Sequence, residues 1–258
     1  MKMRESRVLK KLRAGEVVSC FNVHFDAQCT DIVGMAGFDC LWMDREHLAQ
    51  DWFTLQAHIW AAKNHDMDVM VRVSRGSYSD YIKPLELDAA GIMVPHVMGV
   101  EDAREIVRMT RFHPVGRRPL DGGNADGGYA AMDLPDYIRQ ANEQRFIVVQ
   151  IEDPEPLDEL DAIAALDGID MLFFGPGDFS HSIGAPGQWN HPKLIATRER
   201  VAEVARRNGK FAGIPGTLDN LDELVKMGYQ FVAIGADVVG LGAYARQLAD
   251  GFSKKIAG

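Results

Sequence analysis

Two acidic residues, Glu152 and Asp178, are the strongest candidates for metal ligands in the sequence. Each follows a short apolar run, and roughly one strand–helix unit separates them. Two carboxylates that leave room for water and substrate oxygens suit Mg²⁺ or Mn²⁺. Acids are also favoured at helix N-termini, so the pattern leaves open the alternative that Glu152 only caps a helix.

Arg72 and His47 are the candidates for stabilising charge and moving protons. Arg72 lies inside the apolar run VMVRV, where an unpaired cation is costly. A buried ion pair explains it as well as an anionic substrate or an enolate does. His47 follows another apolar run, beside two acids, and could be a general base or a metal ligand. A solvated or structural histidine is the alternative reading, and the remaining histidines show no metal-binding spacing.

One segment of the chain breaks the regular pattern. Residues 111–133 are rich in Gly, Pro, Asp and Asn, and their centre, residues 121–128, is especially rich in glycine. Long irregular connections are usually functional or disordered. The sequence leaves two interpretations open: a flexible lid or linker, and a wall of the substrate pocket.

The elements that must position these residues are short apolar runs alternating with amphipathic segments. Strands are predicted at residues 17–22, 40–43, 69–73, 91–95, 146–151, 171–174, 210–214 and 231–234. Most of them lack polar alternation, as parallel strands covered on both faces do. Helices are predicted at residues 51–64, 100–110, 134–143, 156–166, 192–208 and 218–227.

This alternation predicts an α/β fold, a (β/α)8 TIM barrel that forms a single domain over residues 1–258. The alternative is an open doubly wound sheet, which the lack of a glycine-rich turn after the first strand disfavours. Catalytic residues of a barrel gather at the C-terminal ends of its strands. The polar or glycine-rich positions at these ends are Asp44, His47, Arg72, Gln150, Glu152 and residues 175–178.

Composition narrows the choice of partners and compartment. The net charge of −9 makes nucleic acid an improbable partner. The three cysteines form no CxxC pair, which favours a reducing cytoplasm over a disulfide framework. The N-terminal segment lacks the apolar region of a signal peptide, and no run approaches the ~18 apolar residues of a membrane span. A cytoplasmic protein without a membrane partner is expected.

At the candidate site residues, the sequence resembles the HpcH/HpaI family of class II pyruvate aldolases. The resemblance extends from about residue 9 to residue 248. The segments that carry it are GFDCLWMDREHLAQD, VMVRV, AAGIMVPHV, RFHPVGRR, VVQIED, IDMLFFGPGDFSHSIG and GYQFVAIGADVVGLG. Several motifs in the same order with matching gaps make a specific resemblance.

The resemblance implies a barrel of the phosphoenolpyruvate/pyruvate type that assembles as a homo-hexamer, a trimer of dimers with the C-terminal helix exchanged between subunits. It implies a divalent metal (Mg²⁺, Mn²⁺ or Co²⁺), held by the Glu of the QIE motif, Glu152, and the Asp of the GPxD motif, Asp178. No organic cofactor is expected.

The remaining site residues also follow from the resemblance. Gln150 of the QIE motif and the backbone of Gly175, Pro176 and Gly177 are expected to bind the 2-oxo acid, whose carboxylate the backbone would receive. Arg72 would stabilise the enolate oxygen, and His47, helped by Asp44, would handle protons.

The chain departs from the family pattern LDxGAxG, which here reads LELDAAG. Glu86 takes the position of the Asp and is expected to support His47, although it is one methylene longer. Asp88 stands at a glycine position. The segments GRRP, PHV and FGPGD also resemble the macrophomate synthase branch, which forms the same enolate by decarboxylating oxaloacetate.

The expected activity is the reversible aldol cleavage of a 4-hydroxy-2-oxo acid to pyruvate, or a similar 2-oxo acid, and an aldehyde through a metal-bound enolate. One alternative is oxaloacetate decarboxylation or a macrophomate synthase-like reaction. The other, from a different class, is a barrel that binds a 2-oxo acid without turnover.

Overall fold

Eight parallel strands close into a barrel in the order of the sequence in the computed structural model, which describes residues 1–257. The strands are β1 Val18–Val23, β2 Cys40–Asp44, β3 Asp68–Arg72, β4 Gly91–Val94, β5 Phe146–Ile151, β6 Met171–Phe174, β7 Phe211–Gly216 and β8 Phe231–Ala236. Each agrees with a predicted strand to within a few residues. The closed parallel barrel confirms the predicted (β/α)8 fold and excludes the open sheet.

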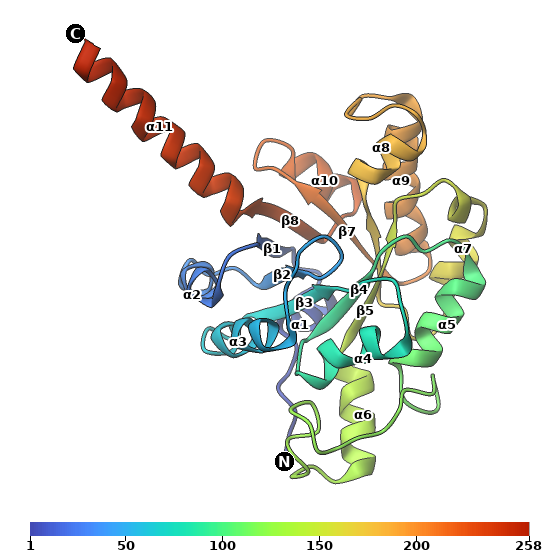
Figure 1. Ribbon diagram of the computed structural model, residues 1–258. Coiled ribbons are helices and arrows are strands. Elements are labelled where there is room, and N and C mark those ends of the chain that lie inside the picture. The colour runs from blue at the N-terminus through green and yellow to red at the C-terminus, as the bar shows by residue number, and fades with distance from the viewer. Residues whose placement is uncertain (258) are drawn as a thin grey trace.

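Helices surround the barrel, as Figure 1 shows. They are α1 Arg7–Arg13, α2 Ala27–Met35, α3 Trp52–Lys63, α4 Tyr78–Glu86, α5 Val100–Thr110, α6 Leu134–Gln144, α7 Leu160–Ala164, α8 Pro176–Ser182, α9 Pro192–Arg207, α10 Leu221–Met227 and α11 Asp237–Ala257. The helix predicted at residues 156–166 is instead a 3₁₀ helix, Glu155–Glu159, followed by α7. Pro156 explains part of this difference, because it supplies no N–H to the hydrogen-bond ladder.

Alternation along the strands divides the core into two layers. Leu41 and Met43 of β2, and the residues at the same alternate positions of the other strands, point outwards and pack against the helices. Cys40 and Trp42 belong to the layer inside the barrel, which also holds Phe173. Because both faces of each strand are buried, the sequence shows continuous apolar runs rather than alternation.

Helix α1 closes the N-terminal end of the barrel. Its Val8, Leu9 and Leu12 are buried within the inner layer. Asp68, at the start of β3, accepts hydrogen bonds from Ser6 Oγ (2.6 Å) and from the backbone N–H of Val8 (3.0 Å). With this end filled by side chains, a substrate can approach the strand ends only from the C-terminal face.

The glycine-rich segment 121–128 is fixed at the N-terminal end of the barrel. Asp126 is buried and forms ion pairs with Arg118 (2.9 Å) and with Arg145 (2.6 Å), the residue that precedes β5. Its backbone N–H also bonds to the Glu86 carbonyl (3.3 Å). Within one chain, the segment therefore lies away from the C-terminal ends of the strands and does not line a pocket there. Its buried ion pairs hold it in place, unlike a freely moving lid.

Helix α11 has a different environment from the other helices. It continues from β8 and projects away from the barrel (Figure 1). Its apolar side chains are exposed, among them Leu241, Tyr244, Leu248 and Phe252. No helix within residues 1–257 has both the length and the apolar content that a bilayer crossing demands.

Candidate active site

Glu152 comes directly after β5 and is almost completely buried, with 1% of its surface exposed. Its Oε1 accepts a hydrogen bond from the His96 backbone N–H (2.9 Å), and its Oε2 accepts one from the side-chain amide of Gln150. A Cβ added at Gly175 would lie 2.5 Å from Glu152 Oε2 and 2.9 Å from Gln150 Nε2. Glycine at this position lets the end of β6 approach the carboxylate.

Asp178 lies in the first turn of α8, after the strand that neighbours β5. Burial, opposed by His96 but reinforced by the Asp178 and Glu46 carboxylates, raises the pKa of Glu152 to about 7. Buried acids that repel each other become stable as anions when a cation lies between them. The structure thus places the two predicted metal ligands, the buried Glu152 and the half-buried Asp178, on neighbouring strand ends.

The donor set at this position fits a hard divalent cation. Within residues 1–257, no group of three or more His, Cys, Asp or Glu side chains is arranged to hold a metal. Glu152 and Asp178 would supply two carboxylates, and water and substrate oxygens would complete the coordination, as is usual for Mg²⁺. Gln150 Oε1 offers a further oxygen, because it is buried without a hydrogen-bond partner among the described residues.

Arg72 and Asp44 form a buried, two-point ion pair at the ends of β3 and β2. Arg72 Nε donates to Asp44 Oδ1 (3.0 Å) and Nη2 donates to Oδ2 (2.6 Å). Burial would raise the pKa of Asp44, but Arg72 and the backbone N–H groups of Glu46 and His47 lower it. Asp44 is therefore ionised and holds the guanidinium in one orientation.

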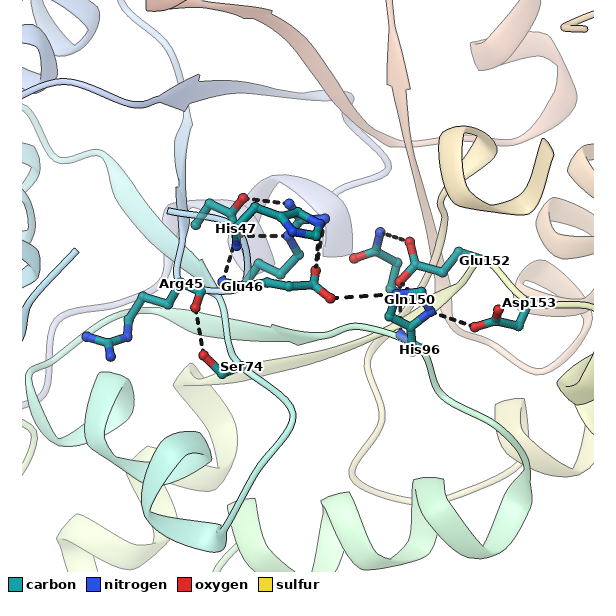
Figure 2. Close-up of polar contacts among 10 residues, drawn as sticks. Arg45, Glu46, His47, Ser74, His96, Gln150, Glu152 and Asp153 are labelled. Atoms are coloured by element: carbon teal, nitrogen blue, oxygen red, sulfur yellow. Dashed lines mark hydrogen bonds and ion pairs between the residues drawn. The ribbon is translucent and has the colours of Figure 1, made fainter. Parts of the chain in front are cut away.

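Glu46 and His96 connect the two halves of the site, as Figure 2 shows. Glu46 Oε2 lies 3.2 Å from Arg72 Nη1, and Oε1 lies 3.7 Å from His96 Nε2. The other ring nitrogen of His96 bonds to Asp153 Oδ2 (2.7 Å). Burial tends to lower the pKa of His96, but the surrounding Asp153, Glu152 and Glu46 carboxylates raise it.

Sequence reasoning missed Glu46 and His96. His96 was one of the remaining histidines without metal-binding spacing, and Glu46 entered only as one of the two acids beside His47. The PHV segment was the available signal for His96, which adopts a positive φ of 48° after β4. This uncommon backbone conformation directs its N–H towards Glu152.

His47 lies on the same rim but at its open edge. Its side chain is 59% exposed, and its Nε2 is 3.6 Å from Glu46 Oε2. Its backbone N–H reaches Asp44 Oδ1 at 3.4 Å. The structure therefore brings His47 next to the Asp44–Arg72 pair, in a position open to solvent.

The backbone at residues 175–177 offers fewer donors than the prediction assumed. The Gly175 N–H already bonds to the Ile151 carbonyl (3.0 Å), and Pro176 has no N–H. Gly177, at the exposed start of α8, is the one residue of the three that can donate a backbone hydrogen bond to a substrate carboxylate.

Glu86 does not join the site within one chain. It is the last residue of α4, and helices that follow strands end at the N-terminal face of a barrel. Burial and the nearby Asp121 and Asp126 raise the pKa of Glu86, while Arg118 opposes them. Within one chain Glu86 therefore lies at the opposite end of the barrel from His47, and the expectation that Glu86 supports His47 stays a prediction.

Comparisons with known proteins agree with this geometry. The model of the HpcH/HpaI aldolase/citrate lyase family matches residues 18–241. The chain is 32% identical to a 5-keto-4-deoxy-D-glucarate aldolase from Enterobacter sp. (strain 638), with 94% of this chain and 95% of that protein covered.

Two solved structures are also similar over almost the full length. An HpcH/HpaI aldolase from Desulfitobacterium hafniense DCB-2 superposes with a TM-score of 0.89 at 28% identity. The match covers 95% of this chain and 96% of that protein. Macrophomate synthase has a TM-score of 0.82 at 27% identity, with 98% of this chain and 90% of its own covered. With the family model matching most of its length, the chain belongs to the HpcH/HpaI aldolase/citrate lyase family.

Proposed function

We propose that the protein is a divalent-metal-dependent aldolase that reversibly cleaves a 4-hydroxy-2-oxo acid to pyruvate, or a similar 2-oxo acid, and an aldehyde. The family is one of aldolases, and the relative cited above is named as an aldolase of a keto-deoxy sugar acid. The observation that carries the proposal is the pairing of Glu152 and Asp178 on neighbouring strand ends, with the raised pKa of the buried Glu152.

The residues of the chain divide the chemistry between them. When bound at Glu152 and Asp178, a cation such as Mg²⁺, Mn²⁺ or Co²⁺ would supply Lewis acidity. Arg72, fixed by Asp44, places a positive charge where negative charge develops on the keto oxygen. Gln150 and the Gly177 N–H orient the 2-oxo acid. Because Arg72 and Glu152 are buried, their charges act in a medium of lower dielectric constant than water.

His47 is proposed to take the proton of the aldol hydroxyl group during cleavage and to return it during addition. In cleavage the bond between C3 and C4 breaks, C4 becomes the aldehyde carbon, and C3 receives a proton from solvent to form the methyl group. The exposed position of His47 allows a water molecule to relay the proton. Glu46, 3.6 Å from His47 Nε2, would orient the ring.

Removal of metal tests this proposal. EDTA is expected to abolish pyruvate formation from a 4-hydroxy-2-oxo acid, and Mg²⁺, Mn²⁺ or Co²⁺ to restore it, because Glu152 and Asp178 alone leave the reacting oxygens without a Lewis acid. Cleavage should be followed with a coupled pyruvate assay. Full activity in EDTA combined with inactivation by borohydride would indicate a lysine imine and reject the proposal.

A second candidate reaction is oxaloacetate decarboxylation, or a macrophomate synthase-like reaction. The similarity to macrophomate synthase over 98% of the chain favours it, and the first half of the reaction would use the same Arg72 and acidic pair. Turnover on oxaloacetate and on a 4-hydroxy-2-oxo acid should be compared under the same metal conditions. A barrel that only binds a 2-oxo acid is not favoured, because the family is one of aldolases.

The assembly and compartment remain part of the proposal. We infer a homo-oligomer, a hexamer built as a trimer of dimers with α11 exchanged, since α11 exposes a row of apolar side chains away from its own barrel. We also propose a cytoplasmic location, because Cys20, Cys29 and Cys40 are all free thiols, as is usual in a reducing compartment.

A further inference from the structure

A cavity of about 330 Å³ lies at the outer rim of β6 and β7, next to the turn that contains Pro176. Its lining includes Pro176 of α8, Trp189 of the following loop, the first turns of α9, and the end of β7 with the residues that follow it. All of these segments lie at the C-terminal ends of the strands. The cavity therefore lies on the same face of the barrel as Glu152 and Asp178.

Pro176 links this cavity to the candidate active site. It follows Gly175, whose backbone abuts the Glu152 carboxylate, and it precedes Gly177 and Asp178. One side of the Gly175–Pro176–Gly177 turn thus faces the acidic pair, and Pro176 lines the cavity. A molecule held at the acidic pair and extending outwards over this turn would reach the cavity.

The lining is mostly apolar but contains one arginine. Leu194, Ile214 and Leu224 form buried walls, and Trp189 is 57% exposed. Arg198 pairs through Nη2 with Glu223 (2.7 Å), but its Nε is buried and has no hydrogen-bond partner among residues 1–257. A buried donor without a partner costs free energy, which an acceptor oxygen on a ligand would recover.

We propose that this cavity is the subsite for the distal part of the aldehyde, and that it takes an aromatic or branched apolar group carrying an acceptor oxygen. The proposal rests on the aldolase function inferred above. A mostly apolar lining with a few polar groups, here Arg198, Thr217 and Asn220, is the usual composition of a small-molecule site. A two-carbon hydroxyaldehyde would leave the cavity unused, whereas an aryl aldehyde places its ring against Trp189 and its oxygen at Arg198 Nε.

The test compares three aldehydes in the aldol addition to pyruvate with Mn²⁺: 4-formylbenzoate, benzaldehyde and glycolaldehyde. For Trp189→Ala we expect KM to rise about tenfold for both aryl aldehydes, and less than about twofold for glycolaldehyde. For Arg198→Met we expect the rise for 4-formylbenzoate only, because benzaldehyde has no distal oxygen. Trp60→Ala is the matched control, since Trp60 is 53% exposed on α3, outside the cavity.

Exchange of the pyruvate methyl protons with deuterated solvent separates this proposal from the function on which it rests, because exchange needs no aldehyde. Normal exchange in every variant, with KM values for the three aldehydes unaltered by Trp189→Ala and Arg198→Met, would overturn the subsite and leave the aldolase standing. An equal rise in KM for all three aldehydes would also overturn it. Lack of exchange in the unmodified enzyme with Mn²⁺ would reject the aldolase function and the subsite with it.

Discussion

At the scale of single residues, the site depends on close approaches that leave no room for larger side chains. Gly175 shows this most clearly, because Glu152 and Gln150 occupy the space where its side chain would lie. Arg72 shows the complementary case: its guanidinium is held by two bonds to Asp44, and only a planar fork can make both.

Gly175→Ala is expected to displace the Glu152 carboxylate and to weaken Mn²⁺ binding at least about tenfold, since the added Cβ lies 2.5 Å from Oε2. Isothermal titration with Mn²⁺ measures the affinity. Gly177→Ala is the control for metal affinity and stability, because no atom lies within 4 Å of its added Cβ. Equal Mn²⁺ affinity in the two variants would show that the Gly175 contact does not position the ligand.

Arg72→Lys is expected to lower kcat by about a hundredfold or more, because it keeps the charge but loses the two-point contact with Asp44. The rate of pyruvate methyl exchange should fall with it, while Mn²⁺ affinity changes little. A variant that keeps the kcat of the unmodified enzyme would mean that Arg72 serves only as a structural partner of Asp44. That was the alternative which the sequence left open.

At the scale of elements, the N-terminal end of the barrel is stabilised by buried charges that come from distant parts of the chain. Asp126, from the glycine-rich segment, contacts Arg118 and Arg145 and accepts a hydrogen bond from Tyr137 (3.0 Å). Burial would raise the pKa of Asp126, but the two arginines outweigh it and lower the pKa. This network fixes segment 121–128 against the start of β5.

Asp126→Asn is expected to lower the free energy of unfolding by about 3–5 kcal/mol at pH 7, because it leaves two arginines without their buried partner. Since the folded-state pKa of Asp126 lies below its unfolded value, the stabilisation is present above that unfolded value, near pH 4, and is lost as the pH falls further.

Thermal unfolding between pH 3 and pH 7 measures this effect. The difference in Tm between the unmodified protein and Asp126→Asn should narrow below about pH 4. Asp121→Asn, an exposed substitution in the same segment, should leave Tm nearly unchanged. A constant difference across the whole pH range would contradict the titration of Asp126 as its cause.

At the scale of the whole molecule, α11 is the helix whose apolar side chains do not pack against its own barrel. It begins at Asp237, whose carboxylate accepts hydrogen bonds from the backbone N–H groups of His24 (3.0 Å) and Phe25 (2.9 Å). Beyond this anchor, Leu241, Tyr244, Leu248 and Phe252 remain exposed. An exposed apolar row of this length favours packing against another protein surface.

Leu248→Asp is expected to shift the protein towards smaller species, because it places a charge within the apolar row of α11. Light scattering coupled to size-exclusion chromatography measures the mass. Gln247→Asp adds the same charge at the neighbouring polar position and should keep the assembly of the unmodified protein. If both variants keep the same mass, α11 does not hold the oligomer together.

Much of the fold and part of the site could be predicted from the sequence, because they depend on local pattern. Apolar runs covered on both faces indicated eight parallel strands, and the alternation of strands with helices indicated the barrel. Residues that follow a strand must lie at its C-terminal end, which placed Glu152, Asp178, Arg72 and His47 on one rim. Glu86 followed from the family resemblance and not from this reasoning, and it ends a helix rather than a strand.

Only the tertiary structure decided which side chains meet. The pairing of β2 with β3 sets Asp44 opposite Arg72, and this register joins residues 28 positions apart in the sequence. The contacts of His96 with Glu46 and Glu152 depend on a positive φ and on barrel closure. The sequence alone determined that Glu152 and Asp178 would lie on adjacent strand ends, because chain order sets strand order in a barrel. How strongly their charges repel was decided by packing, because burial of Glu152 depends on Gly175 and Gln150, which only the closed barrel brings against it.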